Sequence, residues 1–353
     1  MISLSGPTFE SARHYVSNAE AQFRKLSRHG RIDFQYTSRY VHGLLKQLED
    51  RIISRHYNRF CLSSPERISV EEMEIVFKVV STRHISTFEM NYGGFGHVYL
   101  ESFFKAFKSS TIFRLILRNC GIRNNWKPLA DGIIANPNHL RTLDLSGNDL
   151  ITDGPSRLCE VLKATRLEVL KIASCSLKDS VMILILENLP ATLCELDISG
   201  NSDFDITRRS VCDVVCEQFP KTKLQILHVG ICGYIQDLDT MAKIVNKTLT
   251  LRKLQTYTRH PCDEPNAPLT RFICAIGWHP RFETLNNVNT SPQVWYEVRR
   301  AFWRLSCNRS RVLTTLLTGK VLFHRSPKCL LVMLPMCMFR LLFEMAWGLS
   351  ELD

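Results

Sequence analysis

The stretch L-R-T-L-D-L-S-G-N-D-L, residues 140–150, decides the fold of this 353-residue chain. Its apolar positions follow the pattern L-x-x-L-x-L-x-x-N-x-L, and the central x-L-x-L alternation is typical of a short β-strand with one buried face. The pattern returns every 26 to 31 residues, with the polar position alternating between Cys and Asn. Clean copies begin at Ile112, Leu140, Leu167, Leu193 and Leu224.

Weaker copies flank these five, at 85–95 before them and at 251–254 and 282–285 after them. Between the strands, apolar residues recur at helical spacing, as at Phe103, Phe104 and Phe107. One strand and one amphipathic helix cannot bury their apolar faces alone, so neighbouring units must stack. The sequence therefore predicts a solenoid with one strand and one helix in each unit.

The polar position closes the turn at the end of each strand. Asn148 and Asn201 carry amides that can satisfy backbone groups left unpaired there. In the other copies a small buried thiol, from Cys120, Cys175 or Cys232, is expected to fill the same place as a weak donor.

These repeats resemble the ribonuclease-inhibitor type of leucine-rich repeat. The alternating Cys and Asn forms, with L-D-L-S-G-N at 143–148 and L-D-I-S-G-N at 196–201, carry the resemblance, which covers about residues 85 to 290. It implies an α/β leucine-rich repeat solenoid, curved, with parallel strands on the concave face and helices on the convex face. It also implies protein binding on the concave face, without catalysis and without a cofactor, although the partners of such proteins are diverse.

We expect three segments along the chain: a helical N-terminal cap region at 1–84, leucine-rich repeats at 85–290, and a basic and apolar helical C-terminal cap at 291–353. Helical spacing occurs at 40–53 and 70–80, where a partner-binding adaptor helix pair is the alternative to a cap. The apolar run Cys329–Phe339 has 11 residues, fewer than the roughly 20 that a membrane span needs. It favours a buried capping helix over a membrane anchor.

The formal charge of +11 is concentrated near the C-terminus, where residues 294–328 contain eight Lys and Arg residues and one acid. Aromatic residues are interleaved with this segment, which suits acidic proteins, phospholipid head groups or nucleic acid. The other interpretation is the solvated face of a capping helix. The candidate patch for an acidic partner consists of Arg299, Arg300, Arg304, Arg309 and Arg311. The positive charge also argues against inhibition of a basic ribonuclease, because like charges repel on encounter.

Chemistry-bearing motifs are scarce. His260, Cys262, Asp263 and Glu264 are neighbours that could hold a metal or form a nucleophile pair, but four residues in one loop do not specify such a site. Several of the 13 cysteines fall on repeat or helix positions, and Met1–Val16 lacks the apolar run of a secretory signal. We expect free thiols in the cytoplasm, with the nucleus left open, and no catalytic, cofactor or metal site.

The residues between the buried leucines of each strand are expected to point to the concave side. Asp144 and Asp197 belong to the repeat consensus, so local hydrogen bonding is an alternative to ligand contact. Arg114 and Tyr257 depart from it, and Arg and Tyr are favoured interface anchors. The candidate protein-binding residues are Glu89, Arg114, Arg118, Asp144, Lys171, Glu195, Asp197, His228, Lys253 and Tyr257.

The sequence thus predicts a non-enzymatic intracellular interaction module or scaffold that binds a partner protein, and no small-molecule substrate, on the concave face. Binding of nucleic acid or an acidic membrane through 294–328 is the alternative. An enzyme built on 260–264 is a third hypothesis.

Overall fold

The computed structural model describes residues 31–35, 59–63, 70–81, 85–91, 97–123, 126–135, 139–232, 238–258, 272, 275, 279, 281 and 284–286. These residues fall into two compact units, one comprising those up to 206 together with 213–230, and the other 207–212 together with those after 230. We describe each unit separately.

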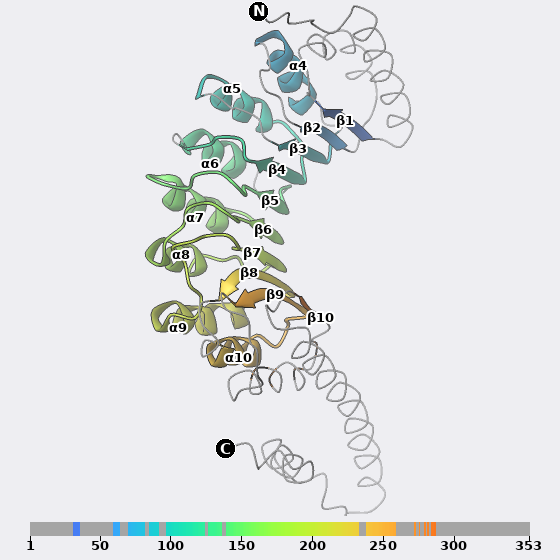
Figure 1. The fold of residues 1–353 in the computed structure, drawn as a ribbon. Coiled ribbons are helices and arrows are strands. Elements are labelled where there is room, and N and C mark those ends of the chain that lie inside the picture. The colour runs from blue at the N-terminus through green and yellow to red at the C-terminus, as the bar shows by residue number, and fades with distance from the viewer. Residues whose placement is uncertain are drawn as a thin grey trace, which may run out of the picture. The chain divides into compact units, whose positions relative to one another are not determined.

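The first unit contains one parallel sheet whose strands follow chain order, with a helix between most successive strands (Figure 1). The strands are β1 (Arg31–Gln35), β2 (Arg59–Ser63), β3 (Thr87–Asn91), β4 (Arg114–Arg118), β5 (Thr142–Asp144), β6 (Val169–Lys171), β7 (Glu195–Asp197) and β8 (Ile226–Cys232). The helices are α4 (Val70–Ser81), α5 (His97–Phe107), α6 (Lys127–Ile134), α7 (Gly154–Ala164), α8 (Asp179–Leu186) and α9 (Arg209–Gln218), and the short 3-10 helix η2 (Phe219–Lys221) follows α9. Residues 209–212 of α9 and 231–232 of β8 belong to the second unit.

One leucine from each repeat forms a continuous column beneath the sheet. Leu143 pairs in register with Leu170, Leu170 with Leu196, and Leu196 with Leu227, and each of these side chains is fully buried. Helices α4 to α8 cover the face of the sheet to which these leucines point (Figure 1). This arrangement confirms the leucine-rich repeat solenoid that the pattern predicts.

The Asn of one repeat fastens the turn of the repeat before it. The Asn148 Oδ1 accepts from the backbone N–H groups of Cys120 and Ile122, at 3.0 and 3.2 Å. Its Nδ2 donates to the carbonyls of Leu117 and Leu145, at 2.6 and 2.7 Å. Asn201 repeats this arrangement one pair of repeats further along the chain.

The Cys at the alternate positions also bonds to the repeat before its own. The Cys175 thiol donates to the Leu145 carbonyl of the preceding repeat, at 3.4 Å, and Cys120 does the same to Met90. The alternation of Cys and Asn is therefore a set of hydrogen bonds between neighbouring turns, as expected from the residue types.

The sheet begins before residue 85, which differs from the expectation of a helical segment at 1–84. Ile32 of β1 pairs in register with Phe60 of β2, and Phe60 with Phe88 of β3. These anchors are 60 − 32 = 28 and 88 − 60 = 28 positions apart, so they continue the repeat period. Stacking of the Phe60 and Phe88 rings, with centroids 5.9 Å apart, replaces the leucine packing of later repeats. The helix expected at 70–80 is confirmed as α4.

The second unit contains helix α10 (Leu238–Lys247) and the parallel strands β9 (Lys253–Thr258) and β10 (Thr284–Asn286). Leu254 pairs in register with Leu285, which confirms the weak repeats expected there. The helix expected at 40–53, the 260–264 cluster and the 291–353 segment lie outside the described residues.

Candidate functional site

The face of the sheet opposite the helices presents the side chains that alternate with the buried anchors. We call it the strand face and define it by residues 59, 89, 114, 116, 118, 142, 144, 169, 171, 195, 197, 226 and 228 of strands β2 to β8. In β4, for example, Leu115 and Leu117 are fully buried, whereas Arg114 is exposed and Ile116 and Arg118 are half-buried. The strand register thus places the candidate residues of the first unit on one surface, as the alternation predicts.

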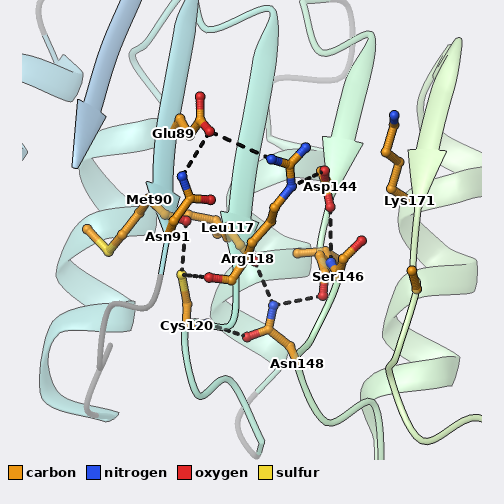
Figure 2. Close-up of polar contacts among 12 residues, drawn as sticks. Glu89, Met90, Asn91, Leu117, Arg118, Cys120, Asp144, Ser146, Asn148 and Lys171 are labelled. Carbon is orange, nitrogen blue, oxygen red and sulfur yellow. Dashed lines mark hydrogen bonds and ion pairs between the residues drawn. The ribbon is translucent and has the colours of Figure 1, made fainter. Parts of the chain in front are cut away.

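Four charged side chains form a chain of ion pairs across β2 to β5. Arg59 bonds to Glu89, and Arg118 lies between two acids, with its Nε 2.7 Å from Asp144 Oδ2 and an Nη 3.8 Å from Glu89 Oε1. Asn91 Nδ2 donates to Glu89 Oε1 at 2.9 Å. Figure 2 shows Arg118 reaching from one carboxylate to the other. The two residues of each ion pair are about one repeat apart in sequence, so the network links neighbouring repeats.

The Glu89 carboxylate is stabilised in its charged form despite its burial. Desolvation by burial pushes its pKa up, but hydrogen bonds from Asn91 and Arg59 and the charges of Arg59 and Arg118 outweigh that effect. The net result is a pKa below the usual value for Glu. Glu89 is only 5% exposed, so it has a structural role in the face and offers little surface to a partner.

The consensus aspartates make local bonds. Asp144 Oδ1 accepts from the Ser146 backbone N–H at 3.1 Å, and Asp197 Oδ1 accepts from the Ser199 N–H at the same distance. The Asp144 bond shapes the turn that leads into Gly147, whose φ of +74° suits glycine, and a Cβ there would lie 2.1 Å from Asn119 Oδ1. Asp144 is buried and has the structural role that was one of its two expected roles, whereas Asp197 is half-buried.

Beyond the network, β6 and β7 carry a second ion pair, with Lys171 Nζ 2.5 Å from Glu195 Oε1. Arg114 differs, because its guanidinium lies over the ring of Phe113, 5.9 Å from the centroid. Phe113 is itself 40% exposed. An exposed Arg beside an exposed aromatic ring is the combination favoured at protein interfaces.

The remaining predicted residues are placed as follows. His228 lies on the strand face in β8 and is half-buried. Lys253 and Tyr257 belong to β9 in the second unit, where Lys253 is exposed. The arginine patch at 299–311 lies outside the described residues.

Two residues of the candidate site, Arg59 and Phe113, were not predicted from the sequence. Arg59 was overlooked because β2 falls in the segment expected as a cap, although the 28-residue spacing from Phe60 to Phe88 was a usable signal. Phe113 precedes the alternating part of its strand, so no pattern marked it as exposed.

The cysteines whose side chains are described take part in no disulfide. Burial raises the pKa of Cys175 to about 12 and also raises those of Cys159 and Cys194. A thiol with a raised pKa is a poor nucleophile. Within the described part of the chain, no group of three or more His, Cys, Asp or Glu side chains is arranged to hold a metal ion. None of the described helices combines the length and the apolar character needed to cross a bilayer.

No family model matches the chain. It is similar to human NACHT, LRR and PYD domains-containing protein 12, with 31% identity over 147 residues that cover 40% of this chain and 14% of that protein. It is also similar to human NACHT, LRR and PYD domains-containing protein 14, with 29% identity over 144 residues that cover 39% of this chain and 13% of that protein. The matches thus span about one seventh of the length of these curated relatives. Both names include LRR, in agreement with the fold.

Among solved structures, the chain is similar to the leucine-rich repeat-containing protein LegL7 from Legionella pneumophila. The TM-score is 0.47 at 14% sequence identity, and the match covers 78% of this chain and 98% of that chain.

Proposed function

We propose that this leucine-rich repeat chain is a non-enzymatic interaction module that binds a partner protein on the strand face and acts as a scaffold or recognition arm. The observation that carries the proposal is the exposed pair Phe113 and Arg114 at the edge of a face whose other charges are held in fixed positions. An exposed aromatic ring and guanidinium on a rigid sheet can bind a partner with little loss of conformational entropy.

The extent of the face favours a macromolecular partner. Seven parallel strands, β2 to β8, at about 4.8 Å spacing make a surface roughly 29 Å across. That width suits a protein interface, which typically buries about 800 Å² on each partner. A small molecule would need a concave pocket with converging polar groups, whereas the polar groups of this face bond mainly to one another.

The thiols support the proposal of a non-catalytic protein in a reducing compartment, for which we propose the cytoplasm. The cysteines whose side chains are described take part in no disulfide, and burial holds the thiols of Cys159 and Cys175 in their protonated form.

Site-specific photo-crosslinking tests the proposal. A photoreactive amino acid is placed at Thr142 on the strand face and, as a control, at the exposed Lys163 of α7. The full-length variants are irradiated in an extract of cells that express the protein. We expect a discrete protein adduct from position 142 that is weak or absent from position 163. Equal adducts from both positions, or an adduct from position 163 alone, would contradict the proposal.

A further inference from the structure

Two charged side chains on the strand face differ from the others in their pairing. Arg59, Arg118 and Lys171 each lie against an acid of a neighbouring strand. Arg114, by contrast, contacts the Phe113 ring, and Asp197 accepts hydrogen bonds only from Ser199 among the described residues. Among the described residues, these two side chains are therefore a cation and an anion that form no ion pair with a neighbouring strand.

The register fixes how far apart the two charges lie. Arg114 of β4 aligns with Thr142, Val169 and then Glu195 of β7, and Asp197 lies two residues further along β7. Three strand spacings of about 4.8 Å and two residue rises of about 3.3 Å place the two Cα atoms about 16 Å apart.

The charged side chains between Arg114 and Asp197 are paired with one another or with Arg118: Asp144 bonds to Arg118, and Lys171, which aligns with Asp197, bonds to Glu195. The other side chains of this area are uncharged. Ile116, Thr142 and Val169 lie there, and all three are half-buried. They present short or branched side chains without charge, so a partner can approach the sheet closely between the cation and the anion.

Any partner that covers this area must neutralise both ends. A charge that is buried in an interface without a counter-charge loses its hydration and gains nothing in return. A partner of one charge sign would match one of the two side chains and leave the other buried and unpaired. The exposed Phe113 ring beside Arg114 also needs an apolar contact.

From these observations we infer that the strand face recognises a protein segment carrying an acidic and a basic group about 16 Å apart, with apolar residues between them. The acid binds Arg114, the base binds Asp197, and the apolar residues cover Ile116, Thr142 and Val169. This inference rests on the proposed function, and it adds the chemical class of the partner segment and the order of its two charges across the face.

Peptide selection on the full-length protein provides the test. A phage-displayed library of random 16-residue peptides is selected on the wild type. Enriched peptides are synthesised, and their affinities are measured by fluorescence anisotropy. We expect peptides with one acidic and one basic cluster, which bind Arg114→Glu and Asp197→Lys at least tenfold more weakly. Exchanging the peptide's acidic cluster for lysines should restore binding to Arg114→Glu.

The control variant is Lys163→Glu, which makes the same charge change on the exposed surface of α7. If Lys163→Glu weakens the peptides as much as Arg114→Glu does, the peptides do not bind the strand face and the proposed function fails as well. If Arg114-dependent peptides carry charges of one sign only, or Asp197→Lys has no effect, this inference alone fails. A library from which no peptide is enriched also counts against it.

Discussion

Replacement of Asn148 by Ala should destabilise the protein more than almost any other single polar substitution in the first unit. The amide makes four hydrogen bonds to backbone groups of two successive turns, between 2.6 and 3.2 Å long. Asn148 is 1% exposed, so the backbone groups left behind would have few water molecules to bond. An unsatisfied buried polar group costs about 1–3 kcal/mol. Partial relaxation and water entry reduce the sum of four such costs, and we expect a loss of about 3–4 kcal/mol.

Urea unfolding followed by circular dichroism measures this loss, with the midpoint and the slope fitted separately. The matched control is Asn188→Ala, just after the end of α8, because the amide of this half-buried residue donates an exposed bond to the Leu184 carbonyl and otherwise contacts the Cys159 thiol. We expect less than about 1 kcal/mol there.

Asn148→Asp tests the donor and acceptor bonds of the amide separately. The substituted carboxylate keeps an acceptor for the N–H groups but places negative charge against the Leu117 and Leu145 carbonyls. The pKa of this carboxylate should therefore be raised in the folded state. The loss of unfolding free energy relative to wild type should then be smallest at acidic pH and grow as pH rises through the usual value for Asp, about 3.9. If Asn148→Ala costs no more than Asn188→Ala, our explanation of the repeat alternation is wrong.

Three further results are expected. Arg118→Glu should lower the free energy of unfolding by about 2–3 kcal/mol, because it places a third acid between Glu89 and Asp144, whereas Arg114→Glu should change it by less than about 0.5 kcal/mol; urea unfolding compares them. Because the pKa of Glu89 is lowered by folding, its contribution is complete above the usual Glu value of about 4.3 and is lost as pH falls through the folded value. The stability gap between wild type and Glu89→Gln should thus be larger at pH 7 than at pH 3, and an equal gap would refute the assigned ion pairs. Cys175, with its pKa near 12, should resist iodoacetamide at pH 8 until urea unfolds the protein, as mass spectrometry can follow; rapid labelling of folded protein would contradict its burial.

The sequence was sufficient to predict the repeats, because each strand anchor is an apolar residue at a regular spacing. Leu143, Leu170, Leu196 and Leu227 occupy the column that the spacing predicts. Helices α6 and α8 were harder to predict. Helix α6 has only 8 residues and contains Gly132, which weakens its helical pattern, and α8 is apolar on nearly all sides, so it shows little amphipathic periodicity.

For the strand face, the alternation along each strand indicated which residues point outward. It could not indicate which of them pair with one another. Arg118 bonds to Asp144 and lies near Glu89 because parallel register brings residues about one repeat apart side by side, and the side-chain rotamer selects among those neighbours. This pairing separates structural charges, such as Glu89 and Asp144, from Arg114, which is available to a partner.

Hydroxyl-radical footprinting of the complex with the cross-linked partner tests the strand-face assignment most directly. Phe113 beside the strand face and Leu184 on helix α8 are 40% and 41% exposed, so each serves as the other's control. We predict that the partner slows oxidation of Phe113 several-fold and leaves Leu184 unchanged. Protection of Leu184 with Phe113 still fully reactive would place the partner on the helices and contradict our account.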